Sequence, residues 1–297
     1  MATARALLLE PSSPSYPIEL TRVPSPPEDI FVRGRVELLL RSPRIAIVGT
    51  RTPTPYGETQ ARHFARVLAG AGAVIVSGLA RGIDEAAHRG ALDVDGATIA
   101  VLGSGVDRPW PDGDLARRMA TEGLLLSEFA PGEGPRRHHF PLRNRIIAAL
   151  STAVVVIEAA HASGSLITAR WAVDQGRDVY ALPGRVDHPM ARGCHRLLRE
   201  GAALIEAPEE LLVELGLTPG SAAIARSDFS PESETLSHLA HSILQALIGE
   251  TLSLDEIITR VAAPPSETLS QLAELELSGF VARSPGGLYR RCLARPP

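Results

Sequence analysis

The sequence predicts an α/β fold in which a doubly wound, mostly parallel sheet is followed by a small second domain. Short apolar segments alternate with helix-like stretches from Ile45 onward, and glycine-containing turns directly follow several of these segments. Strands that alternate with helical crossovers are typical of a parallel sheet covered on both faces. The residues after position 236 differ, because three short helical stretches precede a hairpin. Together these patterns predict an extended Rossmann-like domain and a C-terminal winged helix.

Seven apolar segments are expected to form the strands. They run from IAIVG to ALIEA and lie at residues 45–49, 73–78, 98–103, 124–129, 153–159, 178–184 and 203–207. Between the first two, Ala61, Phe64, Ala65 and Leu68 have the i, i+3, i+4, i+7 spacing of one buried helix face. Residues 16–35 contain too many prolines for a helix, so we expect an extended segment at the sheet edge.

The domain boundaries follow from the same patterns. We expect an N-terminal tail at residues 1–14, the Rossmann-like domain at 15–217, a linker at 218–236 and the winged helix at 237–297. The helices of the winged helix are predicted at residues 242–248, 254–260 and 266–277. Its hairpin is predicted to turn at residues 284–287.

All 30 basic residues of the chain are arginines. Without lysine the chain has no Walker P-loop, no kinase strand lysine and no Schiff-base lysine, so those enzyme classes are excluded. A genome that favours arginine codons would produce the same bias. The net charge of −4 lies in the C-terminal part, because residues 1–226 are neutral and residues 227–297 carry 9 acids and 5 arginines.

The chain is expected to be cytoplasmic. No apolar run reaches the roughly 20 residues that span a bilayer, and the N-terminal segment does not have the pattern of a signal peptide. Cys194 and Cys292 have no metal-binding or redox spacing, which fits a reducing compartment. The histidines have no ligand spacing such as HExxH, so we expect neither a metal nor a cofactor.

The most informative segment is SGLARGIDEAAHRGAL, at residues 77–92, which joins an apolar strand to the start of a helix. Gly78 and Gly82 allow a sharp turn, Ser77 supplies a hydroxyl and Arg81 supplies a guanidinium. These groups and the amides of a helix N-terminus predict an anion site. The usual biological anion is phosphate.

Other turns are expected at the same edge, because ligands of an open parallel sheet bind beyond the carboxyl ends of its strands. Arg51 follows the first strand, Ser163, Gly164 and Ser165 follow AVVVIEA, and a PGR turn ends at Arg185. Each turn alone could serve only tight packing. Four such turns at one edge favour a site for phosphate groups.

Residues 135–150, PRRHHFPLRNRIIAAL, combine four arginines with an aromatic residue and contain no acid. Arginines can hold the phosphates of a nucleic-acid strand while a ring stacks on a base. The residues concerned are Arg136, Arg137, Phe140, Arg143 and Arg145. The alternative is a solvated face on which Phe140 belongs to the core, and the residues alone do not decide between the two.

An enzymatic interpretation also has candidate groups. Asp84 and His88 are four residues apart on one helix face, and Glu158 ends a strand before the SGS turn. Asp84 is equally typical of an acid in a first helical turn, and no nucleophile lies in a recognisable elbow. We therefore expect no catalytic residue.

The third helix of the predicted winged helix is acidic. Its sequence SETLSQLAELEL has three glutamates and no arginine, whereas DNA-reading helices carry basic and amide side chains. We expect this domain to bind a protein rather than DNA.

Six segments resemble, in order, the signature blocks of the bacterial DNA-processing protein DprA family, also called Smf. They are GTRTPTPYG, SGLARGIDEAAHRGAL, TIAVLGSGVDRPWP, FPLRNRIIAAL, EAAHASGSLITARWAVDQGRDVYALPG and RGCHRLLREGA. The resemblance covers residues 16–214. It implies an extended Rossmann fold that binds single-stranded DNA, forms homodimers and helps to load the recombinase RecA during natural transformation, often with a winged helix.

By position, the resemblance implies phosphate contacts for Arg51, Ser77, Gly78 and Arg81. It implies that the strand path continues along Phe140, Arg143, Asn144 and Arg145. Two positions depart from the family pattern, since asparagine is common where this chain has Asp114 and His195.

We therefore predict a non-enzymatic single-stranded DNA binding protein that acts as a recombination mediator, with RecA and a second copy of the chain as partners. The alternative is a nucleotide-processing enzyme related to phosphoribohydrolases, although PGRVDHPMARG lacks the PGGxGT signature of those enzymes. A third possibility is an adaptor that works through the winged helix. Leu211, Leu212, Val213 and Leu215 are candidates for a dimer surface, but they could equally pack inward.

Overall fold

The computed structural model describes residues 6–218, 237–248, 250–284 and 286–291. The chain divides into two compact units, Met1–Ala225 and Arg226–Pro297. Within the predicted linker 218–236, residues 219–236 lie outside the described residues, as do residues 1–5 of the predicted tail and residue 285 of the predicted hairpin turn.

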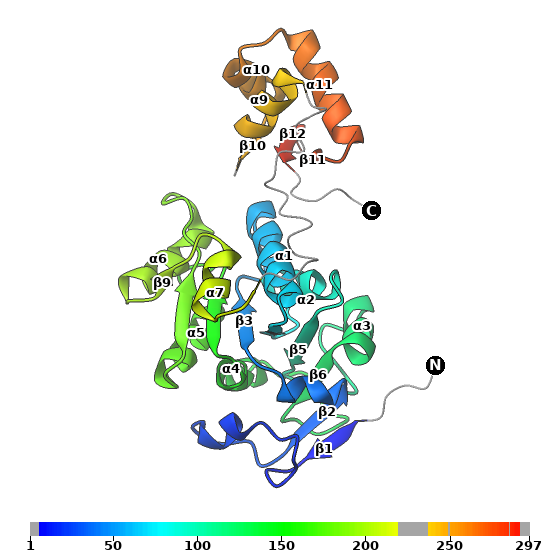
Figure 1. The fold of residues 1–297 in the computed structure, drawn as a ribbon, viewed down its shortest axis with the longest axis vertical. Helices are drawn as coiled ribbons and strands as arrows, with labels where there is room; N and C mark the ends of the chain where they lie inside the picture. Colours follow the sequence, from blue (N-terminus) through cyan, green and yellow to red (C-terminus); the bar gives the residue numbers. More distant parts are fainter. Residues whose placement is uncertain (1–5, 219–236, 249, 285, 292–297) are drawn as a thin grey trace. The chain divides into compact units, whose positions relative to one another are not determined.

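A nine-stranded sheet forms the centre of the first unit (Figure 1). Its strands are β1 (Leu7–Leu9), β2 (Ile30–Gly34), β3 (Arg44–Val48), β4 (Val74–Ser77), β5 (Ala97–Val101), β6 (Leu124–Ser127), β7 (Ala153–Val156), β8 (Asp178–Ala181) and β9 (Ala203–Leu204). They lie in the order β1-β2-β6-β5-β4-β3-β7-β8-β9. Neighbours from β6 to β9 pair in parallel, whereas β1 and β2 are antiparallel. The predicted doubly wound, mostly parallel sheet is confirmed, and β3 to β9 overlap the seven predicted segments.

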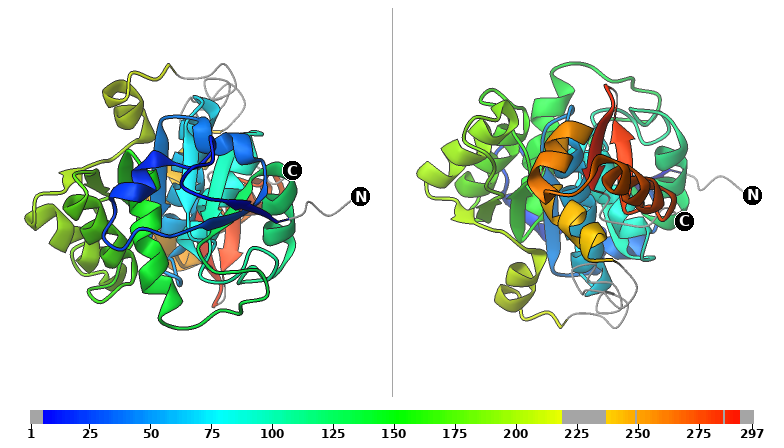
Figure 2. Two further views of the ribbon diagram at one scale, coloured as in Figure 1. Left: turned by 90° about the horizontal axis from the view of Figure 1, so that it is seen from below. Right: turned by 90° about the horizontal axis from the view of Figure 1, so that it is seen from above.

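The N-terminal segment differs from the prediction. Leu7–Leu9 pairs with β2, so part of the predicted tail belongs to the sheet. Residues 16–35 are not wholly extended, because the 3-10 helix η1 (Ile18–Arg22) precedes β2. Pro17 stands immediately before η1, where a missing backbone N–H costs no helical hydrogen bond. The left view of Figure 2 shows this segment in dark blue.

Helices cover both faces of the sheet. They are α1 (Pro55–Gly70), α2 (Ile83–Leu92), α3 (Asp114–Glu122), α4 (His139–Leu150), α5 (Ser165–Asp174), α6 (Arg192–Arg199) and α7 (Pro208–Glu214), with the 3-10 helices η2 (Val36–Leu40) and η3 (Pro189–Ala191). Ile45 and Ile47 of β3 belong to an apolar cluster with α1 and α2. Ala46 and Val48 belong to another with α4 and α5, as the alternation of a strand requires. The predicted stripe on α1 is fully buried in the first cluster.

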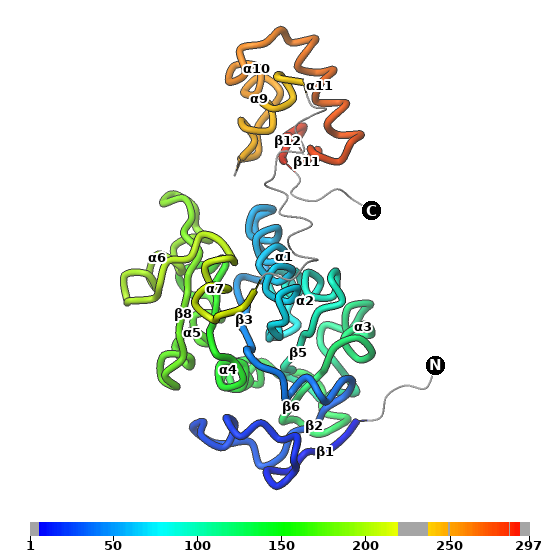
Figure 3. The backbone as a smooth tube through the Cα atoms, viewed as in Figure 1, coloured from blue at the N-terminus to red at the C-terminus, as the bar shows by residue number. Residues whose placement is uncertain are grey.

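The chain reverses direction across the sheet once it has formed β6. It builds β3, β4, β5 and β6 outward in one direction, then returns through α4 to place β7 on the other side of β3 (Figure 3). The loops that follow β3 and β7 therefore leave neighbouring strand ends toward opposite helical layers. Such a switch point is where open α/β sheets bind their ligands.

The second unit has the order of a winged helix. It consists of α9 (His238–Ala246), β10 (Thr251–Leu252), α10 (Leu254–Val261), α11 (Pro265–Leu277), β11 (Val281–Ser284) and β12 (Leu288–Arg291). The strands pair in the order β10-β12-β11. The first helix begins four residues before its predicted start, because Ser237 caps it by accepting a hydrogen bond from the Ala240 N–H at 3.1 Å.

Candidate functional site

The loops after β3 and β7 are joined at the switch point by Glu158. Its carboxylate accepts hydrogen bonds from the Thr54 N–H at 2.9 Å and from the Thr54 hydroxyl at 2.6 Å, and its backbone carbonyl accepts one from the Thr50 N–H at 2.7 Å. Thr54 in turn caps the start of α1 through the Gly57 N–H. Glu158 therefore fixes the loop that carries Arg51, and its carboxylate is almost completely buried.

The SGLARG turn connects β4 to α2 at the same edge. Its conformation depends on small residues, since Gly82 has φ +86° and a Cβ there would lie 2.5 Å from the Thr50 carbonyl oxygen. A Cβ on Gly78 would collide with the Arg143 guanidinium. Leu79 adopts φ +58°, a conformation that is unfavourable for an L-residue and is held here by burial.

The turn already binds an acidic side chain of its own chain. The Asp84 carboxylate accepts a hydrogen bond from the Gly78 N–H at 3.1 Å. Burial raises the pKa of Asp84, and the nearby Arg143 charge opposes that rise. The predicted phosphate contact of the Gly78 amide is thus replaced by a structural contact to an acid six residues away.

Ser77 and Gly78 lie behind the surface. The Ser77 hydroxyl donates to the Ile47 carbonyl at 2.6 Å and is fully buried. Both residues shape the turn from within, which differs from the predicted direct contact with phosphate. Arg81, which lies between them and α2, is exposed as expected.

Arg143 is the largest departure from the predicted strand path. Its side chain is almost completely buried and donates to the Gly78 carbonyl at 2.6 Å, to the Val101 carbonyl and to the Asn144 side chain. Burial lowers the pKa of Arg143 to about 10, so the group keeps its charge at neutral pH. Arg143 ties α4 to the ends of β4 and β5 and presents no donor at the surface.

Arg145 and Asn144 also have internal partners. Arg145 forms two hydrogen bonds with the Glu128 carboxylate, at 2.7 and 2.6 Å, and donates to the Ser25 carbonyl. Asn144 donates to the Gly164 carbonyl at 3.3 Å. These residues hold α4 against the N-terminal segment and the SGS turn, and neither fits the predicted contact with a strand.

The SGS turn lies where it was predicted, at the start of α5. Ser163 and Ser165 share a hydrogen bond of 2.8 Å between their hydroxyl groups, and Ser165 is buried. Gly164 is exposed, and a Cβ there would meet no atom within 4 Å. This turn is the least constrained of the predicted phosphate contacts.

Three predicted residues lie at this edge, and we call them the rim: Arg51 and Arg81, which are exposed, and Phe140, which is half-buried. The Arg51 guanidinium carbon lies 5.3 Å from the centre of the Phe140 ring, in a cation–π contact. Arg81 precedes Gly82, whose backbone packs against that of Arg51. Among the described residues, neither arginine of the rim has an ion pair or a side-chain hydrogen bond. Arg137, in the loop before α4, is also exposed.

The rim has the chemistry of a contact for a nucleic-acid strand. Two guanidinium groups without acidic partners can each hold a phosphate, and the half-buried Phe140 ring offers an apolar surface beside them. The buried charge of Arg143 adds to the positive potential, although Asp84 offsets part of it.

The acid and base candidates of the enzymatic interpretation have structural partners instead. The His88 Nδ1 lies 2.7 Å from the Thr98 hydroxyl, which itself donates to the Ile75 carbonyl, so His88 donates from Nδ1. Burial, followed by repulsion from Arg143, lowers the pKa of His88 to about 3. Asp84 and Glu158 hold the two loops described above. In the parts of the chain that the structure describes, no group of His, Cys, Asp or Glu could hold a metal ion.

Sequence reasoning missed the acids that neutralise the arginines of α4. Glu128 lies directly after β6 in the sequence, at the same sheet edge as the start of α4, which was a usable signal. It also missed the arginine-lined pocket at α6, whose residues 192, 195, 196 and 199 have the spacing of one helix face.

The family model of DNA recombination-mediator protein A matches residues 8–216. The chain belongs to this family. A second model, the DprA winged helix domain, matches residues 227–287. The chain is 41% identical over 288 residues to Protein Smf of Escherichia coli K12, which covers 95% of this chain and 77% of that protein. It is 42% identical over 206 residues to DNA processing protein DprA of Bacillus subtilis, covering 69% of each.

Solved structures of DprA proteins have the same fold. The DprA structure from Streptococcus pneumoniae has a TM-score of 0.68 and 40% identity, covering 72% of this chain and 75% of that one. The DprA structure from Helicobacter pylori, described for its single-stranded DNA binding mode, has a TM-score of 0.65 and 32% identity and covers 71% and 96%. Within the described residues of this DprA family member, no helix is long and apolar enough to cross a membrane.

Proposed function

We propose that this chain binds single-stranded DNA through the rim and acts as a recombination mediator. The observation that carries the proposal is the placement of Arg51 over the Phe140 ring at the switch point of the sheet, with the exposed Arg81 on the adjoining turn. Guanidinium groups and a stacking ring recognise the backbone and the bases of a single strand without reading its sequence. Membership of the recombination-mediator family and the single-stranded DNA binding mode described for the Helicobacter pylori protein support it.

The strand is expected to cross the rim and the SGS turn rather than follow α4 inward. Ser163 and Gly164 lie at the end of the neighbouring strand β7, and Asn144 holds the turn in place. Arg137, in the loop before α4, is exposed and supplies a further positive charge. Arg143 and Arg145 support this surface from below.

The test is the binding of an oligo-dT strand and of a matched duplex across a salt series. Arg51→Ala and Arg81→Ala should each weaken strand binding roughly tenfold, since a hydrogen bond to a charged group contributes about 1.5–3 kcal/mol. Each should also reduce the slope of log K against log salt by about 0.7 for each lost phosphate contact. Arg22→Ala is the control, because Arg22 is exposed on η1, whose Glu19 pairs with Arg44 at the opposite end of β3.

Wild-type binding in both rim variants would refute the site. Duplex binding as tight as strand binding would contradict single-strand specificity.

We further propose that the chain works in the cytoplasm as a homodimer that loads RecA on incoming DNA during natural transformation. Of the four apolar residues considered for dimer contacts, Leu211 and Leu212 are buried, Leu215 packs against the core and Val213 is 81% exposed. Val213 is therefore the one suited to such a contact. To test dimerisation, Val213→Asp should shift the sedimentation coefficient toward that of the monomer. To test RecA loading, the assembly of RecA on strands coated with a single-strand-binding protein should require the wild-type chain.

The enzymatic alternative has a direct test. Incubation with nucleoside monophosphates should release no free base, because Asp84, His88 and Glu158 each have internal partners. Release of base by the wild-type chain, lost in Glu158→Gln, would favour a phosphoribohydrolase.

A further inference from the structure

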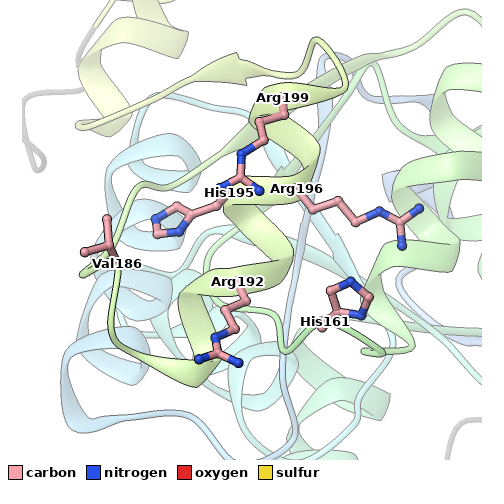
Figure 4. A pocket seen from close by; sticks show the side chains of 6 residues that line it. All are labelled: His161, Val186, Arg192, His195, Arg196 and Arg199. Carbon is pink, nitrogen blue, oxygen red and sulfur yellow. The ribbon is translucent and has the colours of Figure 1, made fainter.

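A second cluster of arginines lies away from the rim, at the ends of β7 and β8. A pocket of about 300 Å³ is lined by His161, Val186, Arg192, His195, Arg196 and Arg199. Figure 4 shows four of these side chains on α6, with His161 and Val186 on loops at opposite sides of the helix in that view. No acid lines the pocket.

The four residues of α6 follow one face of the helix. Positions 192, 195, 196 and 199 have the i, i+3, i+4, i+7 spacing that places side chains along one stripe. Arg196 pairs with Glu200 at 2.7 Å. Among the residues that the structure describes, Arg192 and Arg199 have no ion pair and no side-chain hydrogen bond. Two guanidinium groups are thus unneutralised in one small pocket.

Two histidines line the same space. The His195 Nε2–H donates to the Gly184 carbonyl at 3.0 Å, which orients the ring. His161 is exposed on the loop after β7. The acid of the facing loop, Asp187, is paired with Arg185 at 3.1 Å and does not line the pocket.

The helix that carries these groups is held rigidly. The Gly193 N–H donates to the Ala159 carbonyl at 2.7 Å, and a Cβ on Gly193 would lie 2.6 Å from that same oxygen. Cys194 is fully buried beneath it. The start of α6 is therefore pressed against the end of β7, so the arginines are presented without the ordering cost of a mobile loop.

We propose that this pocket binds a phosphate monoester, either a free mononucleotide or the terminal phosphate of a DNA strand. A monoester carries close to two negative charges and three terminal oxygens, which suit the guanidinium groups of Arg192 and Arg199 that line this pocket. A volume of about 300 Å³ lies at the small end of the range for ligand pockets, which favours a compact group. The site is separate from the rim, and neither rim arginine lines it.

The test uses the full chain in an Arg51→Ala, Arg81→Ala background, so that neither rim arginine contributes to the signal. Calorimetric titration should show binding of dTMP and no binding of thymidine. Arg192→Gln and Arg199→Gln, each added to this background, should weaken dTMP binding roughly tenfold or more, because each removes a hydrogen bond to a charged group. Arg22→Gln in the same background is the control and should leave dTMP affinity unchanged.

Two further probes distinguish the sources of the phosphate. An oligo-dT strand with a 5′- or 3′-phosphate is compared with one that has hydroxyl ends, in wild type and in Arg192→Gln. If the phosphorylated strand binds wild type more tightly than the hydroxyl-ended strand does, and Arg192→Gln abolishes that difference, the pocket binds strand termini. An effect confined to dTMP assigns it to free mononucleotides.

The proposal is overturned if thymidine binds as well as dTMP, or if dTMP does not bind and a terminal phosphate does not tighten the binding of oligo-dT. It is also overturned if dTMP affinity is the same in the Arg192 and Arg199 variants as in the background. None of these outcomes depends on strand binding at the rim.

Discussion

Arg51 and Arg143 both belong to loops and helices at the switch point of the sheet, yet their surroundings are opposite. Arg51 lies exposed on the loop after β3, where its guanidinium lies over the Phe140 ring. Arg143 lies beneath the neighbouring turn, where two backbone carbonyls and the Asn144 side chain accept its hydrogen bonds. The difference shows that a conspicuous arginine in a signature segment can serve the fold rather than the ligand.

The partners decide which role each arginine takes. A buried guanidinium costs several kcal/mol of desolvation unless its donors are satisfied and its charge is compensated. Backbone carbonyls accept the hydrogen bonds of Arg143, and Asp84 lies near its charge. Arg145 forms an ion pair with Glu128. Among the described residues, neither Arg51 nor Arg81 has an acidic partner. An arginine that remains hydrated and unpaired at a strand end keeps its donors for phosphate.

Replacement of Arg143 should therefore give the largest effect. Arg143→Met removes one partner of a buried charged pair and leaves Asp84 uncompensated, so we expect a loss of about 3–5 kcal/mol in the free energy of unfolding. Urea titration followed by circular dichroism measures it. Arg51→Met is the matched control, and it should change this free energy by less than about 0.5 kcal/mol. Equal losses in both variants would remove the distinction between the two arginines.

The burial of His88, which lies near Arg143, predicts that the free energy of unfolding depends on pH. The pKa of His88 is lowered to about 3, whereas an unfolded histidine titrates near pH 6.5. Between these values the unfolded chain binds a proton that the folded chain does not, so unfolding is favoured as pH falls. The stability contribution of neutral His88 is complete above pH 6.5, and about 2 kcal/mol of it should be lost by pH 5.

The variant His88→Gln isolates this contribution. Between pH 7 and pH 5 the free energy of unfolding of wild type should fall by about 2 kcal/mol more than that of His88→Gln. His161→Gln, in which an exposed histidine is replaced, should retain the wild-type pH dependence. Parallel curves for wild type and His88→Gln would show that burial does not keep this imidazole neutral.

Much of the fold follows from local patterns in the sequence. The apolar runs predicted β3 to β8 because a strand buried on both faces has little room for polar side chains, and they predicted β9 although both of its residues are exposed. The stripe on α1 predicted its buried face. β1 was missed because its pairing with β2 is non-local, and Leu7 and Leu8 are about half exposed.

The site was predictable in its location but only partly in its residues. Strand ends followed by Gly, Ser and Arg correctly placed Arg51, Arg81 and the SGS turn at one edge. The burial of the α4 arginines was not predictable from the sequence. Arg143 and Arg145 are buried because the fold brings Asp84 and Glu128, which are distant in sequence, close to them. Burial of a charge is decided by tertiary partners, which a linear motif does not contain.

Phe140 tests whether the rim uses its ring as well as its charge. Phe140→Ala should weaken strand binding by about 1–3 kcal/mol through lost base stacking, with little change in the salt slope. Fluorescence anisotropy of labelled oligo-dT at several salt concentrations measures both quantities. Leu142→Ala is the control, since Leu142 is 49% exposed on the same helix. Equal losses in the two variants would mean that the ring has no specific part in binding.

Arg51→Lys should give the smallest effect and separate charge from shape. Lysine keeps the positive charge, so the salt slope should stay at the wild-type value. It loses the planar group that lies over Phe140 and the forked donors that suit a phosphate, so affinity should fall by roughly 0.5–1 kcal/mol. A variant as weak as Arg51→Ala would show that the geometry of the guanidinium, rather than its charge, accounts for the contact. A variant equal to wild type would show the reverse, and would leave the Phe140 contact without a role in binding.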